Sequence, residues 1–226
     1  MNTPTHFAAL NHKTILIPLI ILSFFLTSCI DYVQSVTYKD GKFRYYCKIT
    51  LSKALTEMGE NNGKNANETF EELSEKMEDN LRITIHGKKI DTDLETGMEF
   101  NFAVDPNTTN SEKRKFLPKV RGDKYYIPLL YINNDSNDDF INVDNSDDME
   151  QSITAAILSS AKFRVLVSKK IIPQINSAYF KGTNASDYAI PFYDYGESFC
   201  FEIPATIMMM NKDYDLSRII INKESL

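Results

Sequence analysis

The first 28 residues constrain the fold most, because they separate an apolar leader from a more polar body. Lys13 and the amino terminus supply positive charge ahead of an unbroken apolar run from Thr14 to Leu26. The run is shorter than the ~20 residues with which a helix crosses a bilayer. A basic start followed by a short apolar core is typical of an export signal peptide. We therefore expect residues 1–28 to be removed and residues 29–226 to fold as a single domain.

The leader ends in the tetrapeptide Leu26-Thr27-Ser28-Cys29. Small residues before the cysteine let a peptidase approach the backbone, which predicts cleavage between Ser28 and Cys29. The tetrapeptide resembles the lipobox of bacterial lipoproteins. The resemblance implies that Cys29 carries acyl chains such as palmitate and becomes the first residue of the mature protein. A buried N-terminal helix or an uncleaved anchor is the alternative interpretation of the same segment.

Acylation of Cys29 would make a membrane the first partner of this chain. Each buried CH₂ group contributes about 0.8 kcal/mol, so two or more acyl chains give stable anchoring. Ile30 follows the cysteine, where an Asp would resemble an inner-membrane retention signal. We therefore expect a lipid-anchored protein of the bacterial cell envelope, with the outer membrane favoured over the inner membrane.

The net charge of the chain argues against nucleic acid as a partner. It is −6 at pH 7, and loss of the leader with Lys13 makes the body more negative. A nucleic-acid-binding protein needs a basic face to neutralise phosphates. Anionic lipid headgroups likewise attract cationic segments. We therefore predict that the acyl chains alone hold the protein on its membrane.

The histidine content argues against an enzyme. The chain has three histidines, and His6 and His12 leave with the leader. His86 remains, beside Gly87 in a predicted turn, so a His-based metal cluster is excluded and any catalytic triad would depend on this residue. The sequence has no Gly-rich phosphate loop, no Gly-x-Ser-x-Gly elbow and no Cys-x-x-Cys pair. We predict a non-enzymatic protein without a cofactor.

The segment 133–148 is dense in Asn and Asp. Its start matches the first ligand positions of a calcium-binding loop, but Phe140 and Ser146 stand where that loop requires Gly and Glu. We favour a solvated loop and no metal. An irregular calcium site is the alternative, and its candidate ligands are Asp135, Asp138, Asp139 and Asp144.

Two cysteines remain if Cys29 is acylated, and an oxidising compartment could pair them. Cys47 alternates with the apolar residues of a predicted strand, whereas Cys200 lies opposite Phe199 and Phe201. Alternation therefore favours two unpaired thiols, with Cys47 in the core. A disulfide between Cys47 and Cys200 is the alternative.

Alternating apolar residues predict a sheet that is built from hairpins. Strands over 31–38 and 42–51 are joined by Asp40-Gly41, a pair that tolerates the positive φ of a tight turn. Further strands are predicted over 81–85, 98–104, 116–120, 124–132, 162–167, 187–193 and 198–203.

Helical spacing and capping residues predict four helices, over 52–58, 69–81, 147–160 and 168–182. The expected fold class is α+β, with three to four helices packed on an antiparallel sheet. The motif Lys-Phe-Arg opens both 42–59 and 162–182, which suggests a weak strand–helix pseudo-repeat.

The predicted function is binding of an apolar ligand or of an envelope partner. Methionine suits adaptable apolar surfaces, so Ile207-Met208-Met209-Met210 is the candidate lining of an apolar pocket. The alternative is a surface-exposed adhesin or antigen that uses the acidic loop and the turn Arg121-Gly122-Asp123.

Overall fold

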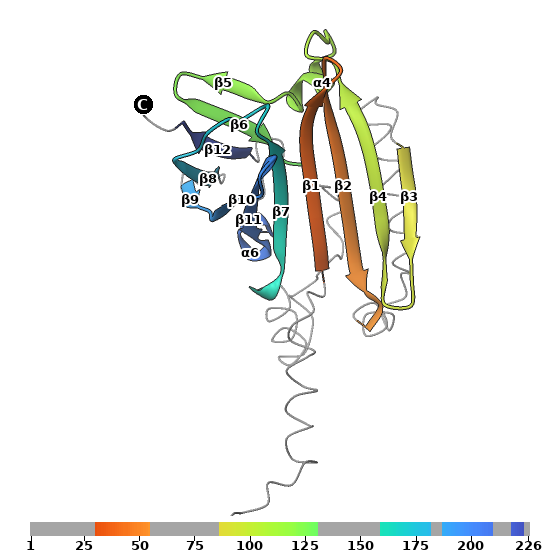
Figure 1. Ribbon diagram of the computed structural model, residues 1–226. Coiled ribbons are helices and arrows are strands. Elements are labelled where there is room, and N and C mark those ends of the chain that lie inside the picture. The colour runs from red at the N-terminus through yellow and green to blue at the C-terminus, as the bar shows by residue number, and fades with distance from the viewer. Residues whose placement is uncertain (1–29, 55–85, 131–158, 182–186, 210–217, 224–226) are drawn as a thin grey trace, which may run out of the picture.

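The computed structural model describes residues 30–54, 86–130, 159–181, 187–209 and 218–223. Of these residues, 62% lie in strands and 11% in helices. The prediction of an α+β fold with three to four helices packed on a sheet is therefore wrong. The described chain is mostly β, with two sheets and two short helices, α4 (Ser111–Lys115) and α6 (Ala205–Met209) (Figure 1).

The larger sheet has seven strands in the order β10-β11-β7-β1-β2-β4-β3. β1 pairs in parallel with β7, and every other neighbouring pair is antiparallel. The strands are β1 (Ile30–Lys39), β2 (Lys42–Ser52), β3 (His86–Asp91), β4 (Glu95–Val104), β7 (Lys162–Ser168), β10 (Phe192–Asp194) and β11 (Ser198–Pro204).

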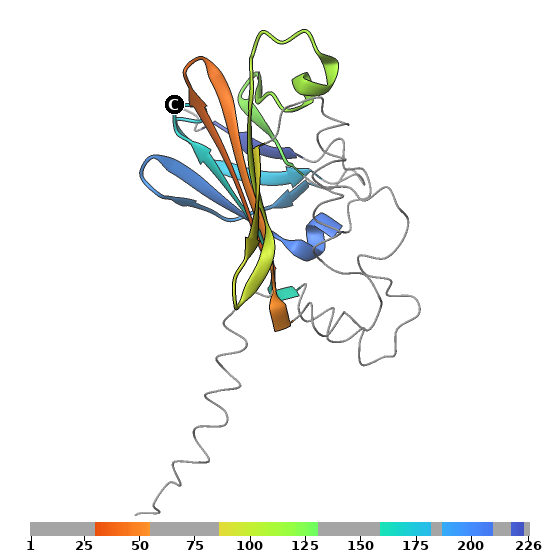
Figure 2. The ribbon, with the colours of Figure 1, turned by 90° about the vertical axis from the view of Figure 1, so that its right-hand side faces the viewer.

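The smaller sheet has five strands in the order β5-β6-β12-β8-β9, all antiparallel. Figure 2 shows it crossing behind the long β1–β2 hairpin. The strands are β5 (Lys119–Arg121), β6 (Lys124–Pro128), β8 (Ser177–Lys181), β9 (Asp187–Ala189) and β12 (Arg218–Asn222).

The β1–β2 hairpin confirms the prediction from its turn residues. Asp40 and Gly41 have φ values of 54° and 75°, the left-handed region that a tight antiparallel turn requires. Pairing continues from Lys39 opposite Lys42 to Ile30 opposite Leu51. β1 thus begins at the first residue that the structure describes.

The inner face of the seven-stranded sheet, which packs against the smaller sheet, contains the core. The alternation predicted for β4 is confirmed, since Met98, Phe100, Phe102 and Val104 are all buried. The fully buried aromatic and aliphatic side chains come from both sheets: Tyr45, Phe100, Phe180, Phe201, Ile127, Ile203, Ile219 and Ile221.

A buried glutamine joins the two sheets. Gln34 of β1 is 0% exposed. Its Nε2 donates to the Pro128 carbonyl (3.0 Å), and its Oε1 accepts from the Leu130 amide (2.8 Å). The Tyr32 hydroxyl donates to the Leu130 carbonyl beside it. These bonds satisfy the Pro128 carbonyl at the end of β6 and the backbone groups of Leu130 after it. Such groups would be costly to leave unpaired in the interior.

The helix predicted over 168–182 is wrong. The chain turns at Lys169 and Lys170 and then forms β8. Ile172 precedes Pro173, and a residue before proline is disfavoured in the helical region. The strand Lys162–Ser168 is confirmed, but the second unit of the suggested pseudo-repeat therefore lacks its helix.

Other boundaries also differ from the predictions. His86 and Gly87 belong to β3 and pair with β4, so the turn predicted there is wrong. The strand predicted over 187–193 is two strands in different sheets, β9 and β10. Pro191 separates them, because proline has no amide hydrogen with which to continue a ladder.

Two predicted elements, the helix over 69–81 and the strand over 81–85, lie outside the described residues. The predicted helix over 52–58 is described at Ser52, which ends β2, and at Lys53 to Ala54, which are helical. The predicted helix over 147–160 is described only at Ser159 to Ser160, which are helical.

Candidate functional site

The candidate site begins at α4, the short helix that follows β4. The Asn110 side chain caps it by accepting from the amides of Glu112 (2.9 Å) and Lys113 (3.2 Å), the usual role of Asn at this position. Three cationic residues, Lys113, Arg114 and Lys115, occupy the last turn, where the helix dipole favours positive charge. The capped helix therefore presents a concentrated positive end.

Aromatic packing fixes α4 on the seven-stranded sheet. The ring of Phe116, which ends the helix, contacts Phe102 edge-on at 5.7 Å between centroids and Tyr45 at 6.4 Å. The Tyr45 hydroxyl donates to the Phe116 carbonyl. From the other sheet, both terminal nitrogens of Arg218 donate to the Lys115 carbonyl at 3.4 Å. Both sheets therefore position this end of the helix.

The β5–β6 hairpin adds further cations. Gly122 turns the chain with a φ of 59°, and Arg121 pairs with Lys124 across the turn. Alternate residues of a strand share a face, so Lys119 and Arg121 project from the same side of β5. The guanidinium carbon of Arg121 lies 5.8 Å from the centre of the Tyr126 ring, within the range of a cation–π contact.

Arg114, Lys119, Arg121 and Arg218, which we call the basic cluster, repel one another. Burial and the charges of the three arginines lower the pKa of Lys119. Burial is the largest cause that acts on Arg218, and it lowers the pKa of this residue. The smaller effect of Tyr45 raises the pKa, and that of Arg121 lowers it. Each lowered pKa means that the folded protein disfavours the positively charged form of that side chain.

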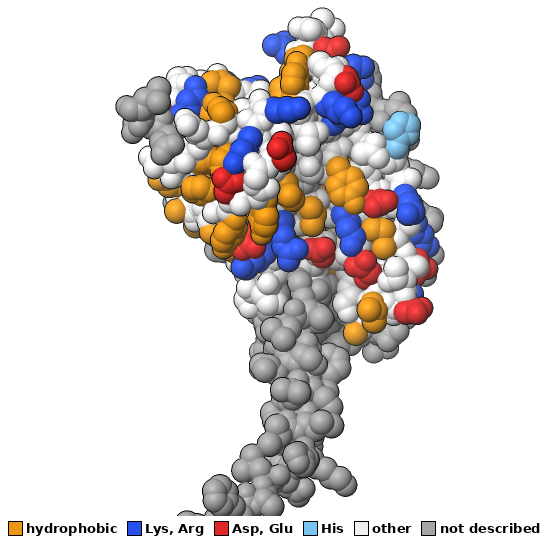
Figure 3. All heavy atoms as spheres, in the orientation of Figure 1, with side chains coloured by type: hydrophobic (Ala, Val, Ile, Leu, Met, Phe, Trp, Pro, Cys, Tyr) orange, Lys and Arg blue, Asp and Glu red, His pale blue; other side chains and the backbone are white. Residues whose placement is uncertain are grey.

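Among the described residues, no carboxylate forms an ion pair with a member of the basic cluster. The helix pair Lys115–Glu112 (2.9 Å) lies beside the cluster. From Ser111 to Pro128 the chain has six cationic and two acidic side chains, although the whole protein is acidic. Figure 3 shows many Lys and Arg side chains, with acidic side chains among them, at the α4 end of the molecule.

This arrangement suits the binding of anionic groups. Arginine presents a planar fork of donors that matches a carboxylate or a phosphate. A neighbouring tyrosine adds apolar contact, because Tyr126 lies under Arg121. Exposed Arg and Tyr side chains are the types that contribute most to protein interfaces.

The lipidation and calcium predictions fall outside this description. The predicted cleavage residues, Ser28 and Cys29, precede the first described residue. The candidate calcium ligands also lie outside the described residues: Asp135, Asp138, Asp139 and Asp144. In the part of the chain that the structure describes, no cluster of three His, Cys, Asp or Glu side chains could hold a metal ion.

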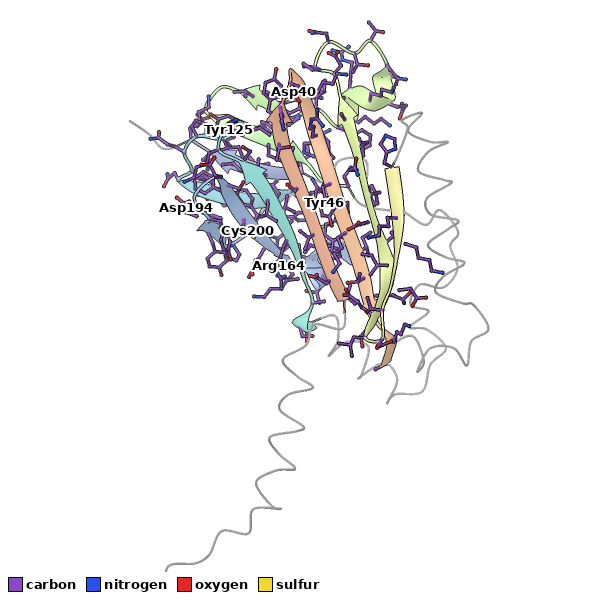
Figure 4. All side chains as sticks on the ribbon, turned by 45° about the vertical axis from the view of Figure 1, so that its right-hand side comes forward. Asp40, Tyr46, Tyr125, Arg164, Asp194 and Cys200 are labelled. Atoms are coloured by element: carbon purple, nitrogen blue, oxygen red, sulfur yellow. The ribbon has the colours of Figure 1, made fainter. Side chains whose placement is uncertain are left out.

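The two remaining cysteines are unpaired. Cys47 lies on the inner face of β2 opposite Gln34, whereas Cys200 lies on the outer face with Tyr46 and Arg164 (Figure 4). Three strand spacings of about 4.8 Å and the thickness of the sheet separate them, so the disulfide alternative is wrong. Burial raises the pKa of Cys47 to about 12 and also raises the pKa of Cys200, which keeps both thiols protonated near neutral pH.

His86 lies beside a shallow polar hollow on the outer face of the seven-stranded sheet. The hollow has a volume of about 390 Å³ and is lined mainly by β1, β2 and β4, with Ser35, Arg44, Tyr46 and Asn101 among its residues. Arg44 is paired with Asp40 (2.9 Å), and the Tyr46 hydroxyl donates to Glu99 (2.9 Å). The polar side chains of the hollow are thus partly engaged with one another.

The segment predicted to line an apolar pocket packs into the core where it is described. Met208 of α6 is 2% exposed, and Ile207 packs against the same cluster. The tripeptide Arg121-Gly122-Asp123 is exposed at the tip of the β5–β6 hairpin, and adhesion through it stays a prediction.

The basic cluster was not predicted from the sequence. The run Lys113-Arg114-Lys115 and the alternating Lys119 and Arg121 were signals that the negative net charge hid. Arg218 gave no such signal, because pairing of β12 with β6 brings it from the far end of the chain.

Comparison of the chain with models of protein families, with curated proteins and with solved structures gives no match. No helix among the described residues is long and apolar enough to span a membrane.

Proposed function

We propose that this chain is a lipid-anchored lipoprotein of the bacterial envelope that binds an acidic protein partner through the basic cluster. It is a binding protein and not an enzyme. The acyl chains on Cys29 hold one end of the body at the outer membrane, and the cluster faces away from it.

The anchor is supported by the leader sequence and by the start of the fold. β1 begins at Ile30, so a lipid on Cys29 leaves almost no tether. Consecutive Cα atoms are 3.8 Å apart, which keeps the start of the large sheet at the membrane surface.

The observation that carries the binding function is the basic cluster at the other end, whose cations form no ion pair with a carboxylate of the described residues. Mutual repulsion within the basic cluster costs stability, and natural proteins depart from favourable local interactions mainly at functional sites. An acidic protein surface would remove the repulsion and would satisfy the arginine donors. Tyr126, which pairs with Lys119 across the hairpin and lies under Arg121, adds an apolar contact on the same face.

Photocrosslinking in intact cells tests the binding function. With p-benzoylphenylalanine in place of Tyr126, which pairs with Lys119 and shares its face of the hairpin, ultraviolet light should join the protein to one acidic envelope protein. Lys119→Glu together with Arg121→Glu should remove this adduct. Lys88→Glu together with Lys89→Glu changes the net charge equally on the distant strand β3 and should leave it intact. A crosslink that survives the first pair would contradict a role for the basic cluster.

Mass spectrometry of the mature protein tests the anchor separately. Acylated Cys29 should be the first residue, and Cys29→Ala should accumulate as the unprocessed precursor. An unchanged mature mass in Cys29→Ala would refute lipidation and would leave the crosslinking result standing on its own.

A further inference from the structure

Leu94 is the most exposed large apolar side chain among the described residues. It is 80% exposed, whereas the next, Tyr195, is 65% exposed and has a polar hydroxyl. A single exposed leucine is common on protein surfaces, so its position and its rigidity decide whether it has a role.

The turn that presents Leu94 is held by hydrogen bonds. The Thr92 amide donates to the Glu95 carbonyl (2.9 Å), and the Glu95 amide donates to the Thr92 hydroxyl (3.1 Å). The Leu94 carbonyl accepts from the Lys53 amide (2.9 Å) of the neighbouring segment. These bonds fix the backbone, so that Leu94 projects from a defined turn.

The turn lies at the end of the sheet from which the chain continues to Cys29. Ile30 is opposite Leu51, which is opposite Thr96, so two strand spacings, about 10 Å, separate Ile30 from β4. Leu94 lies two residues beyond Thr96, on the side toward which the chain leaves β1. Figure 1 shows the β3–β4 turn and the start of β1 at the same end of the sheet.

Among the described residues, four cations at this end are paired with carboxylates and so add little net charge, while the exposed Asp93 beside Leu94 stands outside these pairs. Lys53 pairs with Asp91 (2.8 Å), Lys48 with Glu95 (3.2 Å), Arg164 with Asp31 (3.5 Å) and Lys162 with Glu202 (2.8 Å). Neutralised carboxylates repel anionic headgroups less than free ones.

From this geometry we infer that Leu94 inserts into the membrane interface beside the lipid anchor, and that the β3–β4 turn is a second membrane contact. This inference rests on the lipid anchor proposed above. Cys29 adjoins Ile30 and holds the acyl chains, so the bilayer is the surface that Leu94 meets. A second contact point prevents the body from swivelling about Cys29, and it directs the basic cluster away from the membrane.

The absence of tryptophan from the sequence provides a direct test. The lipidated Leu94→Trp protein is reconstituted into vesicles of phosphatidylethanolamine and phosphatidylglycerol, with and without a phospholipid brominated on its acyl chain. Its emission should shift to the blue on reconstitution, and the brominated lipid should reduce the emission at least twofold. Val120→Trp is the matched control at the other end, and its emission should stay unchanged.

Mass spectrometry of the same samples separates the two claims. If Cys29 is acylated and the vesicles retain the protein, unquenched emission from Leu94→Trp overturns the membrane contact while the anchor stands. Equal quenching of Leu94→Trp and Val120→Trp also overturns it, because the body would then have no fixed orientation. Absence of acyl chains on Cys29 refutes the anchor and the contact together.

Discussion

The two ends of the molecule differ in how their cationic side chains are paired with carboxylates. At the end near Ile30, each of the cations Lys48, Lys53, Lys162 and Arg164 has a carboxylate partner. At the α4 end, the members of the basic cluster face one another instead. The difference shows that the acidic composition of the chain does not force pairing everywhere. Repulsion that persists where carboxylates are plentiful in the sequence supports the proposal that this surface binds a partner.

The sheet separates these ends by more than the range of a screened charge. Tyr45, against which the end of α4 packs, lies opposite Val36, six residues along β1 from Ile30. At about 3.3 Å per residue this is about 20 Å, whereas the Debye length in physiological salt is about 8 Å. In the proposed lipid-anchored orientation, membrane charge would therefore have little influence on the basic cluster.

The largest predicted effect concerns the link between the two ends. The start of β1 belongs to the large sheet and most of the basic cluster to the small one, and Gln34 joins them. Gln34→Leu leaves the Pro128 carbonyl and the Leu130 amide unpaired in the interior, which should lower the free energy of unfolding by about 3 kcal/mol. Urea denaturation measures this, and a loss below about 1 kcal/mol would show that other contacts join the sheets.

A somewhat smaller effect is expected from Gly97 in β4. A Cβ atom at this position would lie 2.0 Å from the Ile49 carbonyl oxygen and 2.7 Å from the Thr50 Cα atom, both backbone atoms of β2. Gly97→Ala should therefore cost about 2 kcal/mol through displacement of the two strands. Gly122→Ala, which meets no neighbour but has a positive φ, should cost about 1 kcal/mol. Equal losses would contradict the close approach at Gly97.

Acid should weaken the end near Ile30. A hydrogen bond from Thr50 and the charge of Lys48 hold the pKa of Glu95 below its usual range. Because the pKa is lower in the folded state, the stabilisation is present above pH ~4.3, the unfolded value, and is lost as pH falls through the folded pKa. Glu95→Gln should cost about 0.5 kcal/mol at pH 7 and nothing at pH 2. A cost independent of pH would mean that the ionised form is not favoured.

The smallest effect has the opposite sign. Lys119 has a lowered pKa in the folded protein, so its charge destabilises the fold until pH rises through the folded pKa. Lys119→Gln should raise the free energy of unfolding by a few tenths of a kcal/mol, as is usual for exposed charges. Added salt should reduce the gain. Thermal melts of both proteins at low and high salt measure it, and destabilisation by Lys119→Gln would contradict repulsion within the cluster.

Local patterns predicted the hairpins and the buried faces of the strands. Asp40-Gly41 and the alternation from Met98 to Val104 are sufficient signals, because each depends on residues adjacent in the chain. The helix predicted over 168–182 was wrong. Apolar spacing favoured a helix in the prediction, but Pro173 disfavours the helical conformation at Ile172. The single strand predicted over 187–193 was wrong for a similar reason, since Pro191 divides it into β9 and β10, which belong to two sheets.

The candidate site was harder to predict because its residues are distant in sequence. Arg114, Lys119 and Arg121 lie within one segment, but Arg218 joins them only through the pairing of β12 with β6. Gln34 was missed for a related reason. A polar residue in a strand predicts a side chain that faces solvent unless its buried partners are known. Here the partners are the Pro128 carbonyl at the end of β6 and the Leu130 amide after it.

Binding of poly-L-glutamate to the lipidated protein in detergent tests the central claim most directly. Affinity is measured by titration at several salt concentrations for the original protein and two variants with equal charge changes. Lys119→Glu with Arg121→Glu should weaken binding about tenfold or more, which corresponds to about 1.4 kcal/mol, and should flatten the salt dependence. Lys88→Glu with Lys89→Glu should change affinity less than about twofold. Equal losses in the two variants would show that net charge, and not the basic cluster, attracts the acidic chain.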